Sequence, residues 1–165
     1  MGALSRFSPS PGLRFGLRFF LFLLLSSLVF WAFSLHEHLG PLQRMIASIS
    51  SVFARAIGGQ ATAQNDDIVV NSMVININHE CTGIFVFMLF ASFVLAYPAS
   101  ASARLIGFGV GIPALFAVNV LRLATLARIV EVYPGLFFYF HEYVWQGIFM
   151  VFVLVSAIAW AERFG

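Results

Sequence analysis

Four long apolar stretches constrain the fold of this chain more than any other feature of its sequence. They cover about 17–35, 82–97, 105–127 and 143–160. Each is near the roughly 20 residues that a helix needs to cross a bilayer, and backbone in lipid must bond within its own segment. The chain is 61% hydrophobic and 10% charged, which excludes an ordinary soluble domain. We predict an all-α membrane protein with one domain over 1–165 and a bundle of about four transmembrane helices.

Basic residues indicate how such a bundle is oriented. Three of them precede or open the first apolar stretch: Arg6, Arg14 and Arg18. The positive-inside rule then places the N-terminal tail 1–16 in the cytoplasm and, after four crossings, the segments 36–81 and 128–142 outside. A cleaved signal peptide is the alternative for the first stretch, but its apolar run exceeds the usual length of about 7–15 residues. We therefore expect an uncleaved anchor in the cytoplasmic (inner) membrane.

The segment that follows the first stretch shows helical and then strand periodicity. Apolar residues over 42–57 recur at the i, i+3, i+4, i+7 spacing of an amphipathic helix. We expect this helix to lie at the outer membrane interface. The polar stretch 58–67 predicts a loop, and the runs 68–70 and 73–78 predict a short β-hairpin before the second transmembrane helix.

Three side chains with complementary chemistry fall near the outer boundary of the predicted bundle. Cys81, the single cysteine, opens the second helix. Arg122 lies roughly 26 Å along the third helix, at 1.5 Å per residue, and His141 ends the outer loop before the fourth helix. A thiol nucleophile, an imidazole that moves protons and a guanidinium that stabilises a thiolate or oxyanion together suit acyl transfer. This chemistry needs no cofactor and no metal, and we predict neither.

Each of these residues also has an ordinary structural explanation. A single cysteine in an apolar protein is often just a small hydrophobic side chain, and it can form neither an intramolecular disulfide nor a CxxC site. Arg122 could extend to the lipid headgroups. His141, next to Glu142, could be an interfacial histidine.

Three neighbours are secondary site candidates. Asn119 stands one helical turn before Arg122, where it would orient the guanidinium or form a bond between helices. His79 and Glu80 flank Cys81 and compete with the later histidine for the role of base.

Three short motifs resemble those of the exosortase and archaeosortase family, in the same order. The run ECTGI at 80–84, before an apolar helix, is similar to the cysteine motif of that family, and NVLR at 119–122 is similar to its arginine motif. His141, before a last helix that carries WQG at 145–147, resembles the histidine motif. The resemblance covers roughly 67–160 and includes the hairpin before the cysteine.

The resemblance implies a membrane-embedded cysteine transpeptidase or protease. Its partners would be secreted proteins that end in a tripartite sorting signal, made of a short motif, a transmembrane helix and a basic tail. It further implies that Cys81 is the nucleophile, His141 the acid/base and Arg122 the transition-state stabiliser. Many exosortases have more spans than this chain, which resembles the short exosortase H form.

Other classes of function remain open at this point. A non-enzymatic membrane assembly or transport partner would contain an unreactive, structural Cys81, whereas an enzyme should show fast thiol alkylation that depends on Arg122 and His141. A metal site would draw on four histidines: His36, His38, His79 and His141. They lack zinc-type spacing. A transporter or channel would use an acidic residue in the middle of a span to carry ions or protons, and the predicted spans have none there. The net charge of +2 is too small, and the charges too scattered, to predict nucleic acid binding.

Overall fold

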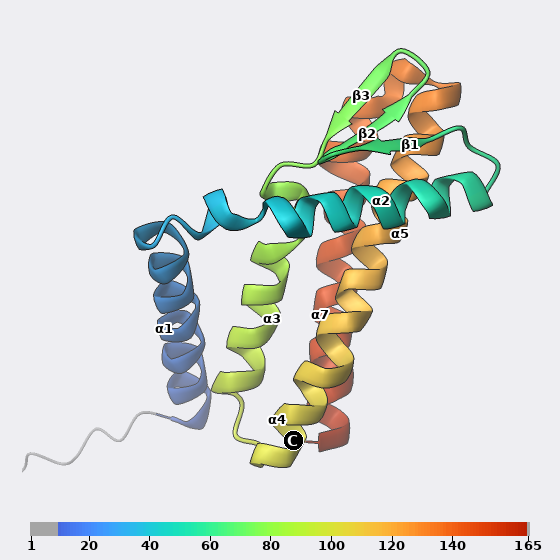
Figure 1. Cartoon of the computed structure of the whole chain (residues 1–165). Coiled ribbons are helices and arrows are strands. Elements are labelled where there is room, and N and C mark those ends of the chain that lie inside the picture. Colours follow the sequence, from blue (N-terminus) through green and yellow to red (C-terminus); the bar gives the residue numbers. More distant parts are fainter. Residues whose placement is uncertain (1–9, 165) are drawn as a thin grey trace, which may run out of the picture.

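The computed structural model describes residues 10–164, most of which are helical (Figure 1). The α-helices are α1 (Pro11–Ala32), α2 (Gly40–Ala56), α3 (Ile84–Ala96), α4 (Ala101–Ile106), α5 (Ile112–Val132), α6 (Phe137–Tyr139) and α7 (Trp145–Phe164). The strands are β1 (Thr62–Gln64), β2 (Asp67–Val70) and β3 (Met73–Asn76). Short 3₁₀ turns are η1 (Leu35–His38), η2 (Glu80–Thr82) and η4 (Pro134–Leu136), and π-helical turns are η3 (Gly107–Gly111) and η5 (Phe140–Val144).

Three helices of the described chain are long and apolar enough to cross a membrane. They are Pro11–Ala32, Ala101–Val132, which joins α4, η3 and α5, and Pro134–Phe164, which ends with α7. The prediction of a helical membrane protein is therefore confirmed. The predicted second span contains α3, which has only 13 residues, fewer than the roughly 20 of a full crossing. The predicted count of four crossings is thus not confirmed.

The long helices form a bundle with a cap at one end. Helices α1, α3, α7 and α5 run alongside one another, while α2 and the sheet lie across one end (Figure 1). The start of α1 and the C-terminus are at the opposite end, near α4. Two buried apolar clusters hold this arrangement together, one between α3, α5 and α7 and the other between α2, the sheet and the end of α5.

The amphipathic helix predicted over 42–57 corresponds to α2, which has Pro41 in its first turn. That position favours proline because no helical N–H is lost there. Ile46, Ala47 and Ala54 are fully buried and pack against the sheet and α5. Helix α2 therefore covers the end of the bundle, and its place at the outer membrane interface stays a prediction.

The predicted hairpin is confirmed, and a third strand joins it. Strands β2 and β3 pair antiparallel around Asn71, whose φ of 52° closes the turn. Strand β1 pairs with β2 inside 58–67, so the prediction of a loop there was wrong. All three residues of β1 are exposed, and the strand forms because β2 offers a free edge rather than because of local sequence preference.

The segment 128–142, which we predicted as an outer loop, is mostly helical, and which side of the membrane it occupies stays a prediction. Helix α5 continues to Val132, and after a turn at Pro134 the chain is helical again, so His141 lies inside the last long helix. The charged residues of this segment form an ion pair and a hydrogen bond to the cap. Arg128 pairs with Glu131 at 3.0 Å, and a Glu131 carboxylate oxygen accepts a hydrogen bond from the backbone N–H of Gln60 in the cap at 3.1 Å.

Glycines of the π-helical turn η3 let α3 and α7 approach the long helix Ala101–Val132 closely. A Cβ on Gly107 would lie 2.7 Å from Nε1 of Trp160, and one on Gly111 would overlap the ring of buried Phe90. We expect Gly111→Ala to lower the free energy of unfolding by about 1–3 kcal/mol, because an overpacked core forces neighbours to move. Gly109→Ala, in the same turn, meets no atom within 4 Å and serves as the control. Equal thermal midpoints for the two purified variants would contradict this expectation.

Candidate active site

Cys81 lies in the tight turn η2 between the sheet and α3. Its amide donates to the side-chain Oδ1 of Asn78 at 3.0 Å, and the Thr82 hydroxyl donates to the His79 carbonyl at 2.6 Å. Gly83, with φ of 77°, then turns the chain into α3. A left-handed residue of this kind favours glycine because no Cβ clashes there. The cysteine thus precedes the helix by a distinct turn instead of opening it, and the residue is 3% exposed.

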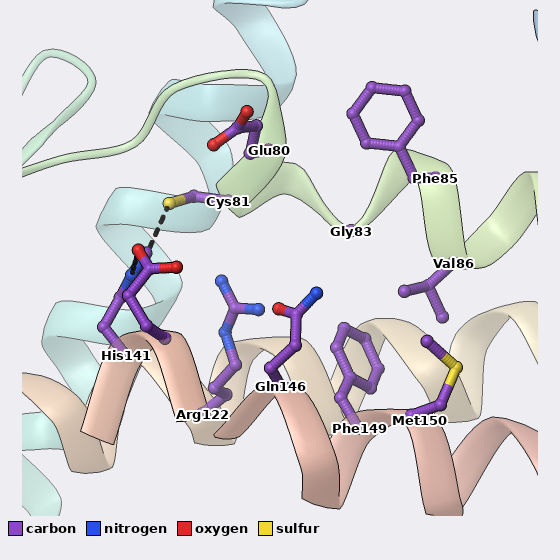
Figure 2. A pocket seen from close by; sticks show the side chains of 11 residues that line it. Glu80, Cys81, Gly83, Phe85, Val86, Arg122, His141, Gln146, Phe149 and Met150 are labelled. Atoms are coloured by element: carbon purple, nitrogen blue, oxygen red, sulfur yellow. Dashed lines mark hydrogen bonds and ion pairs between the residues drawn. The ribbon is translucent and has the colours of Figure 1, made fainter. Parts of the chain in front are cut away.

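His141 lies beside the thiol, although it is 60 residues later in the chain. Its Nε2 lies 3.7 Å from Sγ of Cys81, as the dashed line in Figure 2 marks. The ring stacks on Phe137, with centroids 5.3 Å apart and planes at 19°. The other ring nitrogen, Nδ1, lies 3.0 Å from Oε1 of Glu142. The thiol therefore has an imidazole nitrogen within hydrogen-bond distance, and the stacked ring of Phe137 limits how that imidazole rotates.

Arg122 lines the same cavity from α5, with its guanidinium directed toward the space below Cys81 (Figure 2). Arg122 is only 6% exposed, and its Cζ lies 5.7 Å from the centroid of the Phe149 ring. Within residues 10–164, its buried Nε has no hydrogen-bond partner. An arginine that snorkelled to headgroups would be exposed at its tip, so the buried geometry favours a guanidinium with donors available inside the cavity.

Asn119 anchors the backbone of the nucleophile candidate. It is fully buried, and its Nδ2 donates to the Cys81 carbonyl at 2.9 Å. Of the two predicted roles for this residue, the bond between segments is the one observed. The bond joins α5, the helix that carries Arg122, to η2, the turn that carries Cys81.

The remaining candidates divide between the cavity and its surroundings. Glu80 lines the cavity, whereas His79 packs in an aromatic cluster with Trp31, His36 and Phe85, with ring centroids 5.9–6.1 Å apart. In the described part of the chain, no three His, Cys, Asp or Glu side chains are grouped so as to hold a metal ion.

The cavity has a volume of about 350 Å³ and two kinds of wall. Its polar side carries the thiol, the imidazole, the guanidinium and two carboxylates, those of Glu80 and Glu142. Its apolar side is formed by residues of α3 and α7: Phe85, Val86, Phe149 and Met150. Sequence reasoning missed Glu142 as a site residue, although its position next to His141 was a usable signal.

Burial raises the pKa of the Cys81 thiol, and this effect outweighs the others acting on it. The charge of Arg122 and a hydrogen bond with the Asn78 backbone lower this pKa, while the charges of Glu80 and Glu142 raise it. The charge of Arg122 thus favours the thiolate, as expected for a stabilising guanidinium, but burial has the larger effect on this pKa. At neutral pH the group is a thiol, and it must lose its proton to a base before it can act as a nucleophile.

We expect alkylation of Cys81 to increase with pH up to values at which an exposed thiol is already fully ionised. Below its raised pKa the thiol stays protonated, and the reactive thiolate appears only as pH rises through that value. The measurement is the iodoacetamide mass increment on the single cysteine, with the detergent-unfolded protein as reference. Arg122→Gln should move the midpoint further up. A midpoint below that of the unfolded protein would contradict the expectation.

Comparisons with known proteins give two matches. A family model described as "Transmembrane exosortase" matches residues 2–161. The protein named "Probable archaeosortase E" from Methanocaldococcus jannaschii is 22% identical over 118 residues, which cover 72% of this chain and 64% of that protein. The aligned part is thus less than two thirds of that relative's length. No solved structure matches.

Proposed function

The chain belongs to the transmembrane exosortase family, and from this premise we propose that it is a membrane-embedded cysteine transpeptidase or protease. Its substrates would be secreted proteins with a C-terminal tripartite sorting signal, made of a short motif, a transmembrane helix and a basic tail. With water as the acceptor it would be a hydrolase of peptide bonds. With another nucleophile as the acceptor it would be a transpeptidase.

One observation carries the proposal: the thiol of Cys81 lies 3.7 Å from Nε2 of His141, in a cavity that Arg122 also lines. These residues come from three separate parts of the chain and meet beside an open volume. A nucleophile, a proton carrier and an anion stabiliser around a space for one peptide carbonyl are the parts that acyl transfer needs.

The proposed reaction begins with proton transfer from the Cys81 thiol to Nε2 of His141. The sulfur then attacks the carbonyl carbon of the substrate, and the carbonyl oxygen becomes an oxyanion that Arg122 stabilises. The C–N bond breaks, and the imidazolium gives its proton to the leaving amine. This leaves a thioester between Cys81 and the substrate. An acceptor loses a proton to His141, attacks the thioester, and restores the thiol when that proton returns to sulfur.

The exposed apolar surface supports a fuller proposal for the membrane arrangement. Helix α1 exposes a run of large apolar side chains along its length, as expected of a helix in lipid. Helix α3 would be a fourth, short crossing alongside it. On α2, Met45, Val52 and Phe53 are each about half exposed and would enter the outer interface. The active site would then face the outer side of the cytoplasmic membrane.

The proposal is tested with a substrate taken from the same genome. A secreted protein that ends in a short motif, an apolar helix and an Arg-rich tail is expressed with and without this chain. Mass spectrometry of its C-terminus should show cleavage near the motif only when the chain is present. The control is a substrate in whose sorting signal polar residues replace the transmembrane helix. An intact substrate beside the wild-type chain, together with an unreactive Cys81, would favour the non-enzymatic assembly partner instead.

A further inference from the structure

Glu142 is the one cavity carboxylate that contacts the imidazole. Its Oε1 lies 3.0 Å from Nδ1 of His141, on the side of the ring away from the thiol. Glu80, the other carboxylate of the cavity, makes no hydrogen bond to that ring within residues 10–164. The two acidic side chains therefore share a cavity but differ in what they touch.

The contact is possible because both residues lie in the π-helical turn η5, Phe140–Val144. A π-helical turn contains an extra residue, which makes it wider than an α-helical turn, and such turns occur frequently at functional sites. Here it brings two consecutive side chains, His141 and Glu142, to the same cavity. Phe137, one turn earlier, stacks on the imidazole at 19° and limits its rotation.

We propose that Glu142 is a positioning residue that holds His141 in the tautomer with its proton on Nδ1. A carboxylate only accepts hydrogen bonds, so a proton on Nδ1 is stabilised beside it, whereas a bare Nδ1 lone pair would face a second acceptor. The Nδ1–H tautomer leaves the lone pair of Nε2 directed at the thiol 3.7 Å away. This inference rests on the proposed function, because it specifies how His141 becomes able to accept the thiol proton.

Glu142 would also act after proton transfer. Once His141 takes a proton on Nε2, the ring is an imidazolium and Glu142 becomes its ion-pair partner. This pair is partly exposed, with side-chain exposure of 22% for the histidine and 50% for the glutamate. Exposed ion pairs contribute little to stability, so the expected effect of Glu142 is on orientation and catalysis rather than on folding.

The test reads the tautomer directly and needs no substrate. The protein is labelled with ¹⁵N-histidine and held in lipid bilayers, at a pH where the imidazoles are neutral, and the His141 signals are assigned by their loss in His141→Gln. The wild type should show its proton on Nδ1, and Glu142→Ala should shift His141 to a mixture of tautomers. Glu80→Gln is the matched control and should leave those signals unchanged. A wild-type proton on Nε2, or unchanged signals in Glu142→Ala, would overturn the proposal.

A second measurement tests the consequence for activity. Glu142→Ala should slow processing of the sorted protein by about 10- to 100-fold. The wrong tautomer costs about 10⁴-fold where the orienting carboxylate is buried, and Glu142 is half exposed. Thermal stability should not change. Processing by Glu142→Ala at the wild-type rate would overturn the proposed effect of Glu142 on catalysis. A wild-type chain that processes no substrate would instead contradict the proposed function, and the tautomer measurement would still test the role of Glu142 in orienting His141.

Discussion

Cys81→Ala and Cys81→Ser should each reduce processing of a cognate sorted protein below detection. Alanine has no nucleophile, and a serine hydroxyl in a cavity built around a Cys–His pair is not ionised near neutral pH. Loss of a covalent nucleophile costs about 10⁶-fold in a comparable acyl-transfer enzyme. The measurement is the fraction of substrate that keeps its C-terminal segment after co-expression.

The same assay extends to the partner of the thiol. His141→Ala should fall to the level of Cys81→Ala, and the double variant should be no worse, because the two residues act as one unit. His38→Ala is the control, since His38 is exposed and does not line the cavity. Amounts of each variant in the membrane fraction must match the wild type. Normal processing by Cys81→Ala would exclude the cysteine mechanism.

Arg122→Gln should slow processing by about 10²- to 10³-fold, the effect of removing one oxyanion donor. The physical reason is the buried guanidinium, whose Nε has no partner in the described chain and whose head faces the cavity. Arg122→Lys should restore little, because an ammonium is a point charge without the planar fork of donors. A single-turnover rate with saturating substrate separates this loss from weaker binding.

The control for Arg122 is another arginine of the same helix. Arg128 pairs with Glu131 at 3.0 Å and lies outside the cavity, with 39% of its side chain exposed. Arg128→Gln should therefore process at close to the wild-type rate. If Arg122→Gln and Arg128→Gln behave alike, the guanidinium has no special role in the reaction and its burial is structural.

Much of the fold could be predicted because its signals are local. Apolar length alone identifies α1 and the last two long helices, and apolar spacing identifies α2. The alternating run after Asn71 indicates β3. Strand β1 could not be predicted, because its three exposed residues pair only where β2 provides an edge. The helical state of 128–142 was missed because its charged residues resemble a loop until their partners in the cap are known.

The chemistry of the site was partly predictable for the same reason. The sequence contains one thiol, and spacing along the helices placed Cys81, Arg122 and His141 near one end of the bundle. Whether the groups meet depends on the direction in which each helix points its side chain. The spacing of residues along the sequence does not give that direction. The structure brings Nε2 to 3.7 Å from sulfur, and it does so through a π-helical turn that no periodicity revealed.

The sequence by itself determined that this chain folds in a membrane, because apolar length and the need to satisfy backbone polar groups admit no other solvent. It also determined which side chains could react. Only the tertiary structure decided that the thiol is buried, which raises its pKa, that Asn119 donates to the Cys81 carbonyl, and that Glu142 contacts the imidazole. Those properties depend on desolvation and on distances of a few ångströms between segments far apart in the chain, and such quantities exist only once the segments have packed.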